Sequence, residues 1–200
     1  ERSGNAKLFL TEAMKNADIY VNGDKVQIAS KDVTARINDA LGRLVSAVYH
    51  KLTYIDIVMS EANIRSLFKS SNQQSLTLDG GKEANTHALT DMLNFIAVNS
   101  SAHLKTSMKS LMDRFMKAPY GFVEDDVEWL VAKLFKNGDI SFAVNGSSVT
   151  LLNKSEDELV RYITKKEYLE KLLTERREKA NDNQKKVVRE VMKEMFGNSS

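Results

Sequence analysis

The sequence contains no cysteine among its 200 residues. Disulfide bonds, zinc-thiolate sites and thiol catalysis are therefore excluded together, and a reducing, cytoplasmic compartment fits best. No apolar run approaches the roughly 20 residues that span a bilayer, and no signal peptide opens the chain. We expect a soluble protein with no membrane partner.

An excess of charge of one sign is also missing, since the formal net charge is only +2. That balance forces neither a nucleic-acid nor a membrane interpretation. A hydrophobic content of 42% is enough for one good core or two small ones. The chain starts with Glu1 rather than methionine, and its first stretch already has a helical pattern. We therefore expect a segment of a longer polypeptide.

Helical spacing of apolar residues predicts helices over residues 6–17, 33–50 and 61–68 in the first third of the chain. Between the first two, Asn22-Gly23 stands in an alternating segment, which is typical of a tight β-hairpin. Residues 70–86 are then polar and without period, and they predict a linker or loop.

Only one proline is present, Pro119, and it ends the second of three helices that are predicted over residues 87–98, 102–117 and 123–136. A second hairpin over residues 140–151 follows directly. Three helices closed by a two-stranded hairpin is the order of a winged helix. The residues therefore predict a winged-helix-like module.

The rest of the chain is predicted to be helical. Ser155 with Glu158, and Thr164 with Glu167, match the capping-box pattern that starts helices, and residues 182–196 have one apolar side. The predicted fold class is mainly α with two β-hairpins, in which helices flank the winged-helix-like module. We divide the chain into a helix-hairpin-helix region (1–69), a linker (70–86), the module (87–154) and C-terminal helices (155–200).

The sequence contains no recognisable set of catalytic residues. The three histidines, His50, His87 and His103, are scattered without a nucleophile signature, and no His, Asp or Glu pair has a metal-ligand spacing. Gly80-Gly81-Lys82 is not a phosphate-binding loop, because Glu83 stands where that motif needs a hydroxyl. We expect no catalytic, cofactor-binding or metal-binding residue in this chain, and a hydrolase is disfavoured.

DNA recognition by the module is opposed by its charges. The third helix begins with Glu124, Asp125 and Asp126, and residues 140–152 contain no lysine or arginine. Acidic groups at that end would repel phosphate, so a protein-packing role is favoured. Trp129 and Phe135 lie off the main apolar stripe of this helix, and they mark either a docking surface or a second buried side.

Positive charge gathers further along the chain instead. Residues 161–200 hold 11 Lys or Arg against 7 Asp or Glu, a local net of +4. A solvated helical face is one interpretation, and nonspecific contact with phosphate is the other. The candidates for such contact are Lys165, Lys166, Arg176, Arg177, Lys185, Lys186 and Arg189.

Several segments resemble the large P-loop ATPases of BREX phage-defence systems, of the BrxC type. They are residues 43–52, RLVSAVYHKL; 119–122, PYGF; 130–135, LVAKLF; 162–168, YITKKEY; 176–180, RREKA; and 191–197, VMKEMFG. The resemblance covers most of the chain and rests on loose patterns rather than on one diagnostic motif. It implies a piece of a bacterial defence ATPase outside the nucleotide-binding core, so that ATP and magnesium would belong to the parent protein.

We therefore expect a non-catalytic interaction or assembly region of a BREX-type ATPase, with nonspecific DNA contact as an added role. Its partners would be other defence-system subunits or the rest of the parent ATPase. The alternative is an independent winged-helix DNA-binding regulator.

Overall fold

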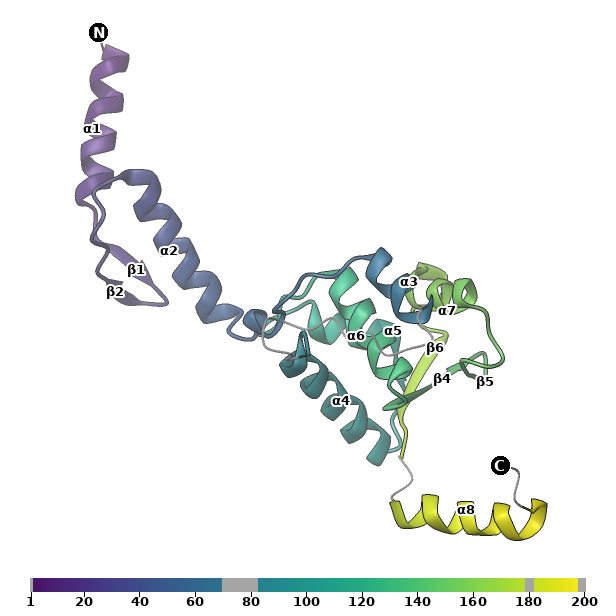
Figure 1. Cartoon of the computed structure of the whole chain (residues 1–200). Coiled ribbons are helices and arrows are strands. Elements are labelled where there is room, and N and C mark those ends of the chain that lie inside the picture. Colours follow the sequence, from purple (N-terminus) through teal and green to yellow (C-terminus); the bar gives the residue numbers. More distant parts are fainter. Residues whose placement is uncertain (1, 70–82, 179–181, 198–200) are drawn as a thin grey trace. The chain divides into compact units, whose positions relative to one another are not determined.

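The computed structural model describes residues 2–69, 83–178 and 182–197. Contacts divide the chain into two compact units. Unit 1 comprises Glu1–Thr53 and Phe115–Phe122, and unit 2 comprises Tyr54–Arg114 and Val123–Ser200. The mainly helical fold with two small sheets is confirmed (Figure 1).

Unit 1 contains the first predicted hairpin. It follows α1 (Arg2–Asn16), and its strands are β1 (Ile19–Val21) and β2 (Asp24–Val26). Asn22 and Gly23 have φ of 53° and 91°, which is the left-handed backbone that a two-residue hairpin turn requires. The longer helix α2 (Val33–Val48) starts at Asp32, whose side chain accepts a 2.8 Å hydrogen bond from the Ala35 amide.

The segment Phe115–Phe122 completes unit 1 with an aromatic cluster. The ring of Phe115 lies 4.6 Å from that of Tyr120 and 6.1 Å from that of Phe122, centroid to centroid. The Lys51 amide, which precedes the short helix η1 (Leu52–Tyr54), donates a 3.0 Å hydrogen bond to the carbonyl of Pro119. This connection between two helices is thus tied to the end of α2.

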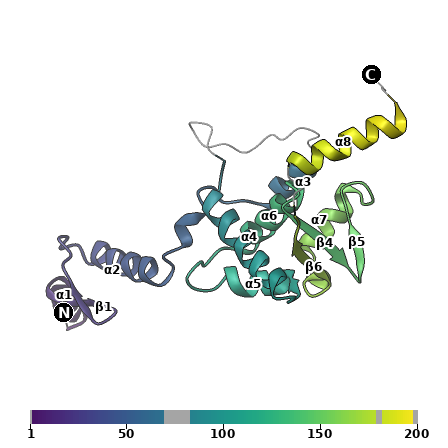
Figure 2. The ribbon, with the colours of Figure 1, turned by 90° about the horizontal axis from the view of Figure 1, so that it is seen from below.

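Unit 2 is built around one buried helix. Its first four helices are α3 (Glu61–Lys69), α4 (Thr86–Ser101), α5 (Met108–Phe115, whose last residue belongs to unit 1) and α6 (Glu124–Lys136). Every residue of α6 from Asp126 to Phe135 is buried, polar residues included. The sheet lies beside α4 and α6 (Figure 1, Figure 2).

The sheet of unit 2 has four strands in the order β3-β6-β4-β5, all antiparallel. They are β3 (Thr106–Ser107), β6 (Leu172–Arg176), β4 (Ile140–Val144) and β5 (Ser147–Val149). The predicted hairpin is therefore present as β4 and β5. However, β6 lies between β3 and β4, and β5 lies at the edge of the sheet. Between β5 and β6 the chain inserts α7 (Glu156–Thr164) and the short helix η2 (Lys166–Tyr168).

Three predictions within unit 2 were wrong. The predicted helix over 102–117 starts only at Met108, because His103 has φ of 54° and Thr106 pairs with Thr174 in the sheet. The Thr164 pattern does not start an α-helix, because α7 ends there. The tail is not all helical, since β6 alternates the buried Leu172 and Thr174 with more exposed neighbours.

The remaining expectations concern the tail and the linker. The Ser155–Glu158 capping box is confirmed, with both of its hydrogen bonds present. Residues 182–196 form α8 (Asp182–Phe196). Residues 70–82 of the expected linker lie outside the described part of the chain, whereas Ala84 and Asn85 are fully buried. The Asn85 side chain accepts hydrogen bonds of 2.7 and 3.0 Å from the amides of Asp56 and Ile57.

Candidate interaction surfaces

The polar residues of α6 are used inside unit 2. Asp126, which is 4% exposed, accepts a 2.8 Å hydrogen bond from the Met59 amide. Lys133, which is 6% exposed, forms a 2.8 Å ion pair with Glu83. These contacts hold the segments that enter α3 and α4 against α6. The helix that a DNA-binding winged helix inserts in the major groove is here the centre of the core.

Glu128 is the most perturbed carboxyl group of this helix. Burial, followed by the charges of Glu124, Asp125 and Glu61, raises the pKa of Glu128 to about 8, against a smaller opposing effect of Lys165. Burial also raises the pKa of Asp126. Asp126 and Glu128 are therefore buried carboxyl groups beside the exposed charges of Glu124 and Asp125. Lys165, a candidate for phosphate contact, partly balances these charges.

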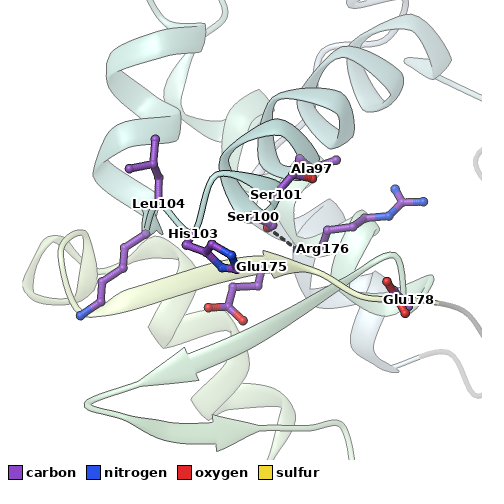
Figure 3. Close-up of a pocket in the computed structure, with 9 residues that line it drawn as sticks. Ala97, Ser100, Ser101, His103, Leu104, Glu175, Arg176 and Glu178 are labelled. Carbon is purple, nitrogen blue, oxygen red and sulfur yellow. Dashed lines mark hydrogen bonds between the residues drawn. The ribbon is translucent and has the colours of Figure 1, made fainter.

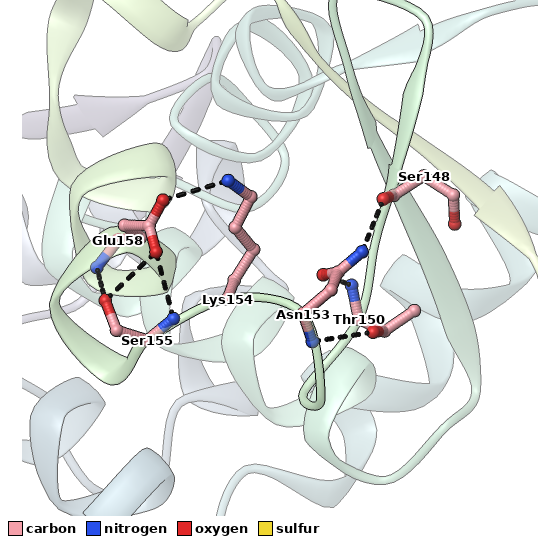
Figure 4. Close-up of polar contacts among 6 residues, drawn as sticks. All are labelled: Ser148, Thr150, Asn153, Lys154, Ser155 and Glu158. Carbon is pink, nitrogen blue, oxygen red and sulfur yellow. Dashed lines mark hydrogen bonds and ion pairs between the residues drawn. The ribbon is translucent and has the colours of Figure 1, made fainter.

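The β4-β5 hairpin has an outer edge that is closed by one side chain. Asn153 donates a 3.0 Å hydrogen bond from Nδ2 to the Ser148 carbonyl and accepts a 2.8 Å bond from the Thr150 amide (Figure 4). The Asn153 amide donates in turn to Thr150 Oγ1. These bonds occupy backbone groups with which another strand would pair.

A groove lies between this hairpin and the C-terminal end of α6. We call it the hairpin groove; its volume is about 630 Å³, and its lining includes Phe135, Lys136, Ile140, Val149, Leu152 and Arg177. Leu152 is 99% exposed, and its neighbour Leu151, which also lines the groove, is 43% exposed. Such apolar exposure next to a concavity is typical of a docking surface.

A second pocket, of about 530 Å³, lies between the end of α4 and the end of β6. Ser100 Oγ accepts a 2.9 Å hydrogen bond from the Arg176 amide. Glu175 and Arg176 extend to opposite sides of β6, as consecutive strand residues do (Figure 3). His103 also lines the pocket.

The candidate phosphate contacts fall in three places. Lys165 and Lys166 lie where α7 ends, Arg176 and Arg177 lie at the far end of β6, and the remaining three are in α8. Lys186 and Arg189 are exposed, and the side chain of Lys185 is outside the described part. No single element gathers these residues into one described patch.

The two aromatic residues that were singled out in α6 differ in position. Trp129 is 1% exposed, so it lies in the core, which agrees with the burial alternative rather than with docking. Phe135 is 7% exposed, stacks on Phe142 with 3.9 Å between ring centroids, and lines the hairpin groove. The exposed Leu152, which sequence reasoning missed, could have been found as an apolar residue between the predicted hairpin and the predicted capping box at Ser155.

Among the residues that the structure describes, no group of three or more His, Cys, Asp or Glu side chains is placed to hold a metal ion. None of their helices is both long and apolar enough to cross a membrane.

Comparison with protein families gives two matches. Residues 51–178 match the model of the winged helix-turn-helix domain of the BREX ATP-binding protein BrxC. Residues 1–44 match the model of the BrxC 4th domain, which is described as having a six-stranded beta sheet. No solved structure matches the chain significantly. Because the winged-helix match alone covers well over half of the chain, this chain belongs to the BrxC family of BREX phage-defence proteins.

Proposed function

We propose that this chain is a non-catalytic assembly region of a BREX defence ATPase, through which the parent protein holds other defence subunits or its own further domains. One observation carries the proposal: the third helix of the winged helix is buried from Asp126 to Phe135. A helix buried to this extent offers little surface to a major groove, which supports packing of the module against protein rather than reading of DNA.

Exposed apolar faces on two helices support an assembly role. In α2, no residue is buried, and five apolar side chains that share one side are 40 to 52% exposed: Ile37, Leu41, Leu44, Val45 and Val48. In α8, Val187, Val188, Val191, Met192 and Met195 are 44 to 70% exposed. Surfaces of this kind gain free energy when a partner covers them.

The residues do not fit the nucleotide that the family name implies. In a phosphate-binding loop the lysine is followed by a hydroxyl residue, which here is replaced by Glu83. Glu83 is engaged instead by Lys133 at 2.8 Å. Residues 80–82 are outside the described part. We propose that ATP and magnesium act elsewhere in the parent protein.

Negative charge introduced on the exposed apolar face of α2 tests the assembly role. Leu41→Asp with Leu44→Asp, introduced in the full-length protein within its complete defence operon, should abolish co-purification of other subunits and restore phage plating. Ser46→Asp is the matched control, because Ser46 is exposed and lies half a helical turn from the apolar face. Co-purification that survives the double substitution would contradict the proposal.

Nonspecific DNA contact is a second candidate, supported by the exposed Lys166, Arg176, Arg177, Lys186 and Arg189. Titration of the chain against duplex DNA at several salt concentrations distinguishes it. Binding that weakens steeply with salt and vanishes in Lys185→Glu, Lys186→Glu, Arg189→Glu would favour DNA contact. Absence of binding at low salt would favour assembly alone.

A further inference from the structure

The hairpin groove has a buried apolar base and an exposed apolar rim. Phe135 and Val149 are buried at its base, where Phe135 stacks flat on Phe142 with an interplanar angle of 2°. Leu151 and Leu152 lie on the rim and are exposed. A rigid aromatic base and a fully exposed leucine are suited to enclose one large apolar side chain of a partner.

The charged side chains in the described lining of the groove have one sign. They are Lys136 and Arg177, and no aspartate or glutamate is among the described residues that line it. The Arg177 side chain reaches over Gly138, with Nη1 4.0 Å from the position that a Cβ would take there. A ligand that places a carboxylate beside its apolar side chain would therefore meet complementary charge at the edge.

The backbone of the hairpin limits the mode of binding. Asn153 already occupies the Ser148 carbonyl and the Thr150 amide on the outer edge of β5. A partner strand cannot pair there without displacing that side chain. Recognition must therefore come from side chains that enter the groove.

We propose that the hairpin groove binds a short segment of a partner protein in which a large apolar side chain is adjacent to a carboxylate. Duplex DNA is the less suitable occupant, because residues 140–152 supply no cation to follow a phosphate backbone. The inference rests on the assembly role proposed above and names the chemistry of one partner surface.

Blocked peptides test this chemistry directly. We expect the peptide GDLLEG to shift the methyl resonances of Leu151 and Leu152 in the 200-residue chain. The peptides GKLLKG, with its charge reversed, and GDAAEG, without large apolar side chains, should shift them little. Shifts of equal size with GKLLKG, or no groove shift with any peptide, would overturn the proposal. Shifts caused by duplex DNA but not by GDLLEG would also overturn it.

Variants locate the binding. Leu152→Ala and Arg177→Glu should each weaken GDLLEG binding about tenfold. Leu104→Ala is the matched control, because Leu104 is 60% exposed and lines the second pocket instead of the groove. Leu152 is 99% exposed, so its replacement should leave the urea midpoint unchanged. Equal binding by all three variants would place the peptide elsewhere and overturn the proposal.

Photo-crosslinking identifies the natural segment. A crosslinking amino acid at position 152 of the full-length protein, in cells with the complete operon, should capture a peptide with an apolar residue next to Asp or Glu. A captured segment without that pair would contradict the inference. This experiment and the α2 test can fail separately. If Leu41→Asp with Leu44→Asp abolishes co-purification but the groove captures nothing, the assembly role is supported and only the inference about the groove is contradicted.

Discussion

The ring of Tyr49 lies against Gly121 so closely that a Cβ on residue 121 would be only 2.6 Å from Tyr49 Cδ1. Gly121 also has φ of 69°, a left-handed backbone that residues with a side chain rarely adopt. Beside it, Lys51 Nζ is 3.4 Å from the Tyr120 hydroxyl. This contact of ring and glycine therefore fixes how the segment Phe115–Phe122 meets the end of α2.

Gly121→Ala should destabilise this contact. A non-glycine residue in the left-handed region costs on the order of 1–2 kcal/mol, and the clash with the Tyr49 ring adds to that. We expect faster hydrogen exchange at the Lys51 amide, which donates to Pro119, and a lower free energy of unfolding in urea.

Gly146→Ala separates backbone strain from the clash. Gly146 has φ of 80°, but a Cβ there would meet nothing within 4 Å. Its replacement should therefore cost less than that of Gly121. Adding Tyr49→Ala to Gly121→Ala should recover part of the loss, whereas strictly additive effects would argue against the contact.

The stability of unit 2 should fall as pH rises from about 4.5 to about 8. The raised pKa of Glu128, about 8, means that the folded chain keeps a proton which the unfolded chain releases near pH 4.5. Linkage then lowers the free energy of unfolding by up to about 1.4 kcal/mol per pH unit in this window, and the slope from Glu128 vanishes above pH 8. Urea unfolding at several pH values measures the slope.

Glu128→Gln is the matching variant, because an amide has similar size and no titrating charge. The difference in stability between the variant and the unchanged chain should grow with pH and favour the variant at pH 8. Asp126, whose pKa burial also raises, is present in both chains and cancels in this difference. Parallel pH profiles would show that Glu128 is ionised in the folded state.

Asn153→Ala should release the outer edge of β5. Two hydrogen bonds to Ser148 and Thr150 are lost, and because both are exposed the expected cost is about 0.5–1.5 kcal/mol. The freed edge should also promote self-association, measurable by light scattering at high concentration. Asn153→Asp keeps the acceptor for the Thr150 amide and loses the donor to Ser148, so an intermediate cost is expected. Asn153→Ala with unchanged stability and association would refute the edge-closing role.

Asp126→Ala should destabilise unit 2 more than Asp126→Asn. Alanine leaves the buried Met59 amide without its acceptor, at a cost of about 1–3 kcal/mol, whereas asparagine keeps an oxygen in place. Asparagine also removes a charge that burial penalises, as the raised pKa shows. Urea unfolding at pH 7 compares the two, and equal losses would mean that the hydrogen bond contributes little.

Local sequence patterns were sufficient where the determining contacts are local. The Asn22-Gly23 turn, the predicted second hairpin and the Ser155 capping box each depend on a few adjacent residues, and all three are present in the structure. The sequence left the role of Trp129 open between docking and burial, and its burial depends on the elements that pack around α6.

Strand β6 could not be predicted, because the strands with which it pairs, β3 and β4, are distant from it in sequence. Leu172 and Thr174 are buried in the sheet, where β6 pairs with β4 and β3, and the segment LLTER has a single β-branched residue, Thr174, and no turn signal that marks a strand. The hairpin groove was missed similarly. Its lining joins the end of α6 to Arg177, some 40 residues later, and only the completed sheet brings them together.

The pairing of Thr106 with Thr174 also sets the order in which this domain can form. Those partners are 68 positions apart, and Thr174 Oγ1 donates to the Thr106 carbonyl across the same gap. During synthesis, the central strand position stays empty until β6 leaves the ribosome. High contact order of this kind slows folding, because the loop entropy is lost before the pairing energy is gained. The edges of β3 and β4 that pair with β6 therefore stay uncovered during synthesis until β6 is made, and β3, which is made first, stays uncovered longest.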